Sequence, residues 1–230
     1  MTPRRYRRIR EVLDRRQPDL TVLLDRVNKP FNLAAVLRSC DAVGVFEAHA
    51  VASGEPALTN LRASGGSGKW VPLHSHGSLH DALRAIRAKG MQLVAAANAP
   101  EARDFREVDY THPTALVLGA ELDGLRPEAL GEVDHHVAIP MAGMGDSLNV
   151  SAANAVLLFE AQRQRQAAGF YNEPRLDAET YWGTVFRWGY PSLARYCDAR
   201  GLAYPRLRES DGSLWDPVPG GWREVNDQAD

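Results

Sequence analysis

The sequence predicts an α/β fold, with a mostly parallel sheet covered by helices on both faces. Short apolar runs that are typical of buried strands alternate along the 230 residues with segments of helical periodicity. The clearest strand, TALVLGA at 114–120, is apolar throughout, as strands buried on both faces are. Ligands of such folds bind at the carboxyl ends of the strands, so the loops that follow the central strands are expected to line a site.

The first three elements follow from local pattern. Residues 4–16 contain no glycine or proline and place Ile9, Val12 and Leu13 on one side, which predicts a helix that ends before Pro18. The apolar run LTVLLDRV at 20–27 predicts a buried strand. Helical spacing of apolar residues over 30–43 predicts a helix that stops at Gly44.

The middle of the chain alternates in the same way. A short apolar run predicts a strand at 48–52, and the glycine- and serine-rich stretch 53–69 is expected to be a loop. A third strand is expected at 70–73, followed by a helix over 79–89 that Ser78 caps and Gly90 ends. The apolar run 92–97 predicts the next strand.

After the strand at 114–120, a short helix is expected at 127–130 and a strand at 136–140. A long helix follows over about 148–168, with Val150, Ala153, Val156, Leu157 and Ala161 near its inner face. The loops after 92–97, 114–120 and 136–140 should therefore lie at one edge of the sheet.

Three parts of the chain differ in character. Residues 1–18 are expected to form a basic helical arm, 19–171 the α/β domain, and 172–230 a tryptophan- and proline-rich extension. Within the extension, 176–200 is expected to be at least partly helical, and the rest to be an extended tail that packs only locally.

Composition narrows the class of protein. The net charge of −2 argues weakly against a nucleic-acid binder, but the arm concentrates positive charge that can attract phosphates locally. A solvated helix face is the competing interpretation. Two distant cysteines favour a reduced, cytoplasmic setting, and neither a membrane span nor a secretory signal is expected. The arginines at the start of the arm are Arg4, Arg5, Arg7 and Arg8.

Two segments place polar residues beside strand ends. Asn32 lies near the start of the helix at 30–43, where it could act as a cap, and Arg38 follows six residues later. Glu121 comes directly after the strand at 114–120, beside glycines that allow a ligand to approach the backbone closely. Taken singly, these residues are better explained as a cap and a surface arginine, and Glu121 alone is a weak signal beside the interpretation as a solvated glutamate.

The segment IPMAGMGDSLNVS at 139–151 is the most informative. A strand ends there, and a loop with two glycines leads into a helix whose first residues include Ser147 and Asn149. A helix N-terminus offers free N–H groups to ligand oxygens, although Asp146 or Ser147 could also serve as a simple cap.

Three other well-known sequence motifs are absent or incomplete. The chain has no Gly fingerprint of a nicotinamide enzyme, no complete phosphate loop around Lys69 and no nucleophile elbow. The pairs His74/His76 and His135/His136 lack further metal ligands, so surface histidines are the better interpretation and no metal is expected.

Together, in this order and spacing, the three segments resemble the motifs of the SpoU family of RNA 2′-O-ribose methyltransferases. The resemblance covers about residues 5–171 and is greatest to members that modify guanosine 18 of tRNA. It implies a sheet whose C-terminal part forms a deep trefoil knot, a homodimer whose sites draw on both subunits, S-adenosylmethionine as methyl donor and tRNA as substrate. The knot in particular could not be inferred from pattern, since general topology rules disfavour it.

The resemblance also implies roles for individual residues. Arg38 matches the catalytic arginine, and the residues that match its surroundings are Asn32, Glu121, Ser147 and Asn149. Positions that line the donor pocket in the family match Ala96, Gly119, Ile139 and Leu148. Arg38 would act either as a base when desolvated with a substrate phosphate, or as a cation that holds that phosphate and stabilises the alkoxide. Methylation of ribosomal RNA and a non-catalytic RNA-binding protein remain the alternatives.

Overall fold

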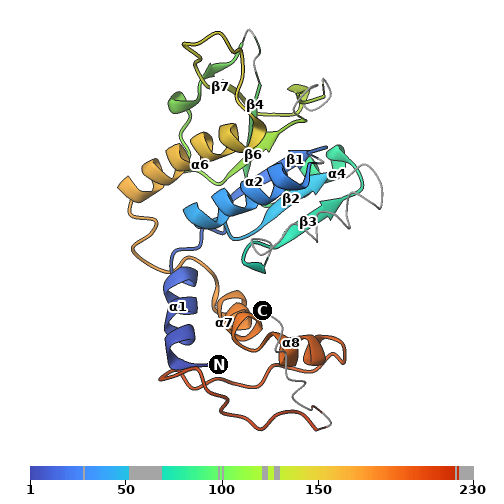
Figure 1. Ribbon diagram of the computed structural model, residues 1–230, viewed down its shortest axis with the longest axis vertical. Helices are drawn as coiled ribbons and strands as arrows, with labels where there is room; N and C mark the ends of the chain where they lie inside the picture. Colours follow the sequence, from blue (N-terminus) through green and yellow to red (C-terminus); the bar gives the residue numbers. More distant parts are fainter. Residues whose placement is uncertain are drawn as a thin grey trace. The chain divides into compact units, whose positions relative to one another are not determined.

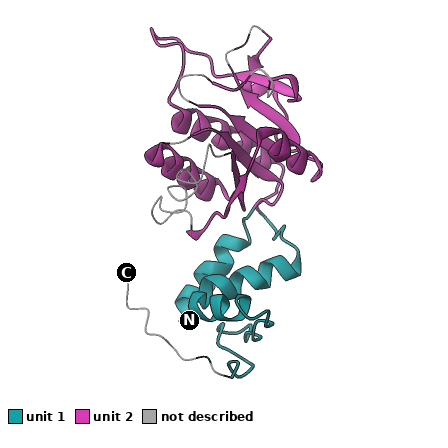
Figure 2. Ribbon diagram, turned by 90° about the vertical axis from the view of Figure 1, so that its right-hand side faces the viewer, with its two compact units in different colours: residues 1–16, 172–230 teal, residues 17–171 magenta. Residues whose placement is uncertain are grey.

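The computed structural model describes residues 1–27, 29–51, 69–97, 99, 101–120, 124–126, 130–220 and 222. They fall into two compact units, coloured separately in Figure 2. Residues 17–171 form the larger unit, and residues 1–16 together with 172–230 form the smaller one.

The larger unit is built on a parallel sheet with the strand order β3-β2-β1-β6-β4-β7-β5 among the described residues (Figure 1). Every strand pairing is parallel, as the sequence predicted. The carboxyl ends of β6, β4 and β7 therefore meet at one edge of the sheet. The strands are β1 Leu20–Asp25, β2 Ala48–Val51, β3 Leu73–His76, β4 Gln92–Ala96, β5 Arg103–Asp104, β6 Thr114–Leu118 and β7 His135–Ala138.

Helices cover both faces of this sheet. Helices α2 (Pro30–Val43) and α6 (Val150–Ala167) pack on one face in a core that includes Val22 and Leu24 of β1. Helix α4 (Leu79–Arg87) packs on the other face, in a core that includes Leu23. Thr21 and Asp25 of β1 are also buried, and the alternation explains why Val22, Leu23 and Leu24 between them are all apolar. Burying each such side chain stabilises the fold by about 1.5–3 kcal/mol.

The smaller unit contains α1 (Pro3–Leu13), α7 (Ala178–Gly189) and α8 (Pro191–Asp198). Tyr6 and Ile9 of α1 are buried in one core with Val185 of α7, and this leaves the arginines of α1 on the exposed face. The expectation that the C-terminal tail packs only locally was wrong, because the Tyr6 hydroxyl donates a hydrogen bond of 3.1 Å to the carbonyl of Glu209.

Several element predictions need correction. The third strand lies at Leu73–His76 and not at 70–73, because its pairing with β2 selects the later residues. Strand β5 and the 3-10 helix Phe105–Glu107 (η2) were missed, since two and three residues carry too little periodicity. On α6, Val156 is 36% exposed while Leu158 is buried. The predicted loop 53–69 and helix 127–130 lie largely outside the described residues.

The histidines of β2 and β3 form a cluster and are not all on the surface. His49 is 3% exposed, and its Nδ1 lies 3.0 Å from Nε2 of His76. Nε2 of His74 lies 3.0 Å from a carboxylate oxygen of Glu47. Burial lowers the pKa of His49 to about 4 despite the neighbouring Glu47. A desolvated imidazole that stays neutral therefore packs at this edge of the sheet.

Three further features concern the chain as described. Cys40 and Cys197 are both buried, and neither forms a disulfide. Of the helices in the described ranges, none combines the length and apolar character needed to cross a bilayer. The same residues hold no cluster of three or more His, Cys, Asp or Glu side chains suited to a metal ion.

Candidate active site

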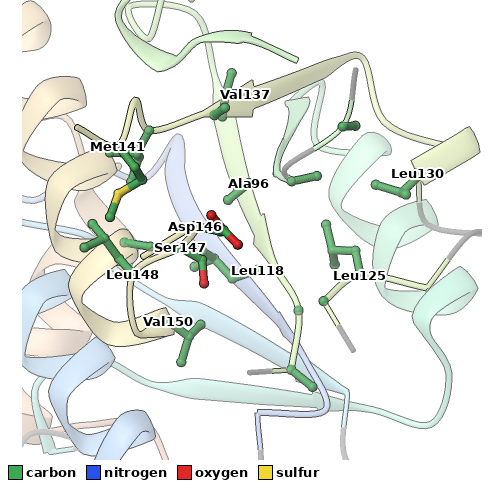
Figure 3. A pocket seen from close by; sticks show the side chains of 18 residues that line it. Ala96, Leu118, Leu125, Leu130, Val137, Met141, Asp146, Ser147, Leu148 and Val150 are labelled. Carbon is green, nitrogen blue, oxygen red and sulfur yellow. The ribbon is translucent and has the colours of Figure 1, made fainter. Parts of the chain in front are cut away.

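A cavity of about 480 Å³ opens where β4, β6 and β7 end and α6 begins (Figure 3). Its size lies in the range of small-molecule sites. The three loops that were predicted to lie at this edge do border it. Its wall is mostly apolar, and among the described lining residues only Asp146 and Ser147 have polar side chains. The lining residues used below are Ala96, Gly119, Gly124, Leu125, Leu130, Ile139, Asp146, Ser147 and Leu148.

One wall of the cavity depends on a close approach of backbone to backbone. A Cβ atom on Gly119 would lie 2.2 Å from the carbonyl carbon and oxygen of Gly124, so only glycine fits. The amide of Gly124 donates a hydrogen bond of 3.0 Å to the carbonyl of Ala120. Gly124 has φ 63°, a left-handed conformation that favours glycine. Gly119 and Gly124 therefore present backbone, not side chains, to the cavity.

The opposite wall is the N-terminus of α6. Asn149 is the N-cap, and its Oδ1 accepts hydrogen bonds from the amide and hydroxyl of Ser151, at 2.9 and 2.6 Å. Its Nδ2 donates to Oδ1 of Asn32 at 3.3 Å, which joins α6 to the first turn of α2. The expected caps, Asp146 or Ser147 for α6 and Asn32 for α2, were wrong, because Asn149 and Lys29 occupy those positions.

The structure brings most of the sequence-predicted site residues together. All four predicted donor-pocket residues line the cavity, and so does Ser147. Asn32 and Asn149 are in direct contact beside it. Arg38 lies on α2 with an exposed side chain, and among the described residues no hydrogen bond is recorded from it to either asparagine. Glu121 lies outside the described residues.

Sequence reasoning missed four residues of this region. Leu125 and Leu130 line the cavity, and neither was predicted to be a pocket residue. Asp25, whose side chain is fully buried, forms an ion pair with Arg126, whose side chain is 37% exposed, next to the Leu125 wall. The available signal was the carboxylate that ends the apolar run of β1, the same pattern that singled out Glu121.

The arginines of the arm lie in the smaller unit. Arg4, Arg5, Arg7 and Arg8 are all exposed on α1. Arg5 donates a hydrogen bond of 3.0 Å to the carbonyl of Trp188, and Arg8 lies 3.5 Å from Glu11. The exposed face of α1 is therefore strongly basic.

The sequence of this chain is similar to the sequences of known proteins. The sequence profile of the SpoU rRNA Methylase family matches residues 19–159, and that of the SpoU rRNA methylase C-terminal region matches residues 163–216. A Thermus thermophilus protein named tRNA (guanosine(18)-2′-O)-methyltransferase is 57% identical over 187 residues, which cover 81% of this chain and 96% of that protein.

Two solved structures are also similar. The TrmH/SpoU tRNA modifying enzyme of A. aeolicus superposes with a TM-score of 0.75 at 42% identity, covering 82% of this chain and 96% of that one. The AdoMet-bound rRNA methyltransferase of Sinorhizobium meliloti has a TM-score of 0.58 at 35% identity, covering 67% of this chain and 59% of that one. The match of the family profile to most of the chain shows that this protein belongs to the SpoU methylase family.

Proposed function

We propose that this protein transfers a methyl group from S-adenosylmethionine to the ribose 2′-OH of tRNA, at guanosine 18 of the D-loop. The observation that carries the proposal is the 57% identity to a relative of that name, which extends over 96% of the relative. The rRNA methyltransferase from S. meliloti is more distant, at 35% identity over 59% of its chain. Ribosomal RNA is therefore the less favoured substrate.

The cavity suits the methyl donor. When bound, S-adenosylmethionine supplies an electrophilic methyl group on a sulfonium centre. Backbone groups at Gly119, Ile139 and Leu148, together with the apolar side chains of Ala96 and Leu125, would hold the donor. The close approach of Gly119 to Gly124 supports this fit, because a side chain at 119 would displace the wall. Asp146 offers a carboxylate to a cationic ligand.

The residues beside the cavity would position the ribose. Asn32 and Asn149 form a pair of amides beside the cavity that would orient a hydroxyl, and Ser147 lines the same cavity. Such orientation lowers the barrier for an in-line transfer by fixing the attacking oxygen. Glu121 would fix Arg38 or the loop 139–149 by hydrogen bonds.

Arg38 would act as a cation in this scheme. Its side chain is exposed, and a guanidinium is a poor base near neutral pH because it keeps its proton. It would bind a phosphate of the RNA through two parallel hydrogen bonds and stabilise the alkoxide that develops as the 2′-OH loses its proton. The proton would pass to solvent or to that phosphate.

Substitution of Arg38 tests this scheme. Arg38→Ala should reduce single-turnover methyl transfer by at least about 100-fold, because a charged group that stabilises developing charge is lost. Binding of the donor should stay within about twofold of wild type, since Arg38 does not line the cavity. Arg38→Lys should recover little activity, because lysine lacks the fork geometry. Near-normal transfer by Arg38→Ala would rule out the assigned role.

The outward face of α6 supports the homodimer that the family resemblance implied. Val156 and Phe159 are 36% and 51% exposed. Exposing two apolar side chains to water adds no stability to the helix, and neighbouring exposed apolar residues are typical of interfaces. Phe159→Glu should therefore convert a dimer to monomers in sedimentation, and an unchanged dimer would place the interface elsewhere.

We also retain the deep trefoil knot as a proposal, supported by the family membership and by the order β6-β4-β7 around the cavity loops.

The basic face of α1 would bind the tRNA backbone. Since tRNA is the substrate, we further propose that the protein works in the cytoplasm. The non-catalytic alternative predicts RNA binding without transfer of label. The presence of Arg38, Asn32 and Asn149 in the sequence favours catalysis.

A further inference from the structure

The last residue of β1 carries a buried charge. The carboxylate of Asp25 has an exposed fraction of 0%. Arg126 donates two hydrogen bonds to it, from Nε to Oδ2 at 3.1 Å and from Nη2 to Oδ1 at 2.9 Å. Nε of Arg26 lies 3.6 Å from Oδ2. Because a buried carboxylate is costly without a partner, the two-pronged bond fixes where Arg126 lies relative to β1.

Arg126 connects two residues of the cavity wall. Leu125 directly precedes it, and the amide of Leu130 donates a hydrogen bond of 3.2 Å to its carbonyl. Both leucines line the cavity. Leu125 is 7% exposed and packs in the same core cluster as Leu23 and Val51. The position of Arg126 therefore sets how far this wall stands from the sheet.

The backbone at the end of β1 is itself constrained. Arg26 has φ 57°, a left-handed conformation that is unusual for a residue other than glycine. Its amide donates a hydrogen bond of 3.2 Å to the carbonyl of Val51. Such a conformation persists only where the surroundings determine it, and it directs the chain away from β1 immediately after Asp25.

We propose that Asp25 and Arg126 are a positioning pair for the methyl-donor site. The pair holds the wall formed by Gly124, Leu125 and Leu130 at the separation from α6 that the donor needs. Neither side chain lines the cavity, so both act through the wall and neither is catalytic. The inference rests on the proposed function, because it takes this cavity as the site of S-adenosylmethionine.

The pair can be tested by measuring the affinity for the donor in the full chain. Calorimetric titration with S-adenosylmethionine should give dissociation constants about tenfold higher for Arg126→Ala and for Asp25→Asn. The double variant should be no weaker than the weaker single one, because both changes remove the same interaction. Arg126→Lys should fall between wild type and Arg126→Ala, since it keeps the charge and loses the fork.

Kinetics separate positioning from chemistry. Each variant should raise KM for the donor about tenfold and change kcat at saturating donor by less than about threefold. Affinity for tRNA, measured by filter binding, should not change. A larger loss in kcat than in KM would overturn the proposal, since it would show that the pair acts on the reaction and not on the wall.

Two matched controls account for general destabilisation. Asp19→Asn removes the charge that lies 2.6 Å from Arg165 at the opposite end of β1, away from the cavity. Arg206→Ala breaks an Arg–Asp pair of the same two-pronged geometry in the smaller unit, with bonds to Asp216 of 3.1 and 3.0 Å. Asp19→Asn should lower the midpoint of thermal unfolding, Arg206→Ala should change it little because that pair is exposed, and both should leave the affinity for the donor within about twofold.

Gly119→Ala distinguishes failure of the pair from failure of the site. If the two pair variants bind the donor as wild type does while Gly119→Ala is weakened, the positioning role is wrong and the donor site stands. If Gly119→Ala also binds normally, the assigned donor site is wrong and the pair's role falls with it. Equal loss of donor affinity in Asp25→Asn and Asp19→Asn would attribute the effect to stability, and this too would overturn the proposal.

Discussion

Replacement of Gly119 by alanine is the smallest change that should disable the cavity. The added Cβ would lie 2.2 Å from the carbonyl carbon and oxygen of Gly124 and 2.4 Å from the amide nitrogen of Leu125. Ordinary contact begins at 3.4 Å, so the wall must retreat by about 1.2 Å, the difference between 3.4 and 2.2 Å. The contacted atoms belong to the backbone and cannot rotate away as a side chain would.

This displacement should lower both the stability of the fold and the activity of the site. Overpacking of this kind costs about 1–3 kcal/mol of folding free energy. For a unit of this size, each kcal/mol lowers the unfolding midpoint by about 2–4 °C. A displacement of about 1 Å at a reacting site can reduce activity by up to about 100-fold. We expect the dissociation constant for S-adenosylmethionine to rise by about 10- to 100-fold and the protein to remain folded.

The assay is calorimetric titration of the donor, with thermal unfolding of the same samples. Gly77→Ala is the matched control, because a Cβ there meets nothing within 4 Å and its φ is not left-handed. That variant should match wild type in both measurements. Wild-type affinity and midpoint for Gly119→Ala would refute the reasoning, since the close approach to Gly124 would then have no consequence.

Three further predictions concern RNA binding, pH and stability. Neutralising Arg4, Arg5, Arg7 and Arg8 together should flatten the dependence of tRNA affinity on salt, because fewer counterions are released; an unchanged slope in filter binding would contradict this. His49 has a pKa of about 4 in the fold against an ordinary 6.5, so the unfolded chain binds its proton first and stability falls as pH drops from about 6.5 to 4. The difference between these two pKa values corresponds to on the order of 3 kcal/mol of unfolding free energy. Urea unfolding of His49→Phe should therefore show an unfolding free energy that depends less on pH between about 4 and 6.5. Asn154 is fully buried on α6 and neither of its side-chain polar atoms has a partner in the described part of the chain, so Asn154→Leu should raise the unfolding free energy by about 1–3 kcal/mol; a lower unfolding midpoint would mean that the amide is bonded.

Much of the fold was predictable because its elements are long or strongly patterned. The apolar run at β6 and the capped helix α4, with Ser78 accepting from the amide of Asp81, are each determined by neighbouring residues in the sequence. Strand β3 was displaced by three residues because its pairing with β2 decides its register, and no local signal reports that pairing. Val156 was expected inside because helical spacing does not distinguish a face that packs within the chain from an apolar face left exposed.

The site was predictable only where chemistry is concentrated in short motifs. Ser147, Leu148 and Asn149 stand in one segment, and the contact between Asn149 and Asn32 joins two segments that the motifs had already singled out. Asp25 and Arg126 escaped notice because they are 101 positions apart, and their pairing depends on β1 and β6 lying side by side. Long-range ion pairs of this kind require the topology before they can be recognised.

The central claim concerns one hydroxyl of one nucleotide, and one measurement tests it directly. Methyl transfer from radiolabelled S-adenosylmethionine would be measured on an unmodified tRNA transcript and on a matched tRNA with 2′-deoxyguanosine at position 18. Label is expected on the ribose of guanosine 18 in the first RNA and none is expected in the second. Equal labelling of the two RNAs, or label found only on ribosomal RNA, would contradict it.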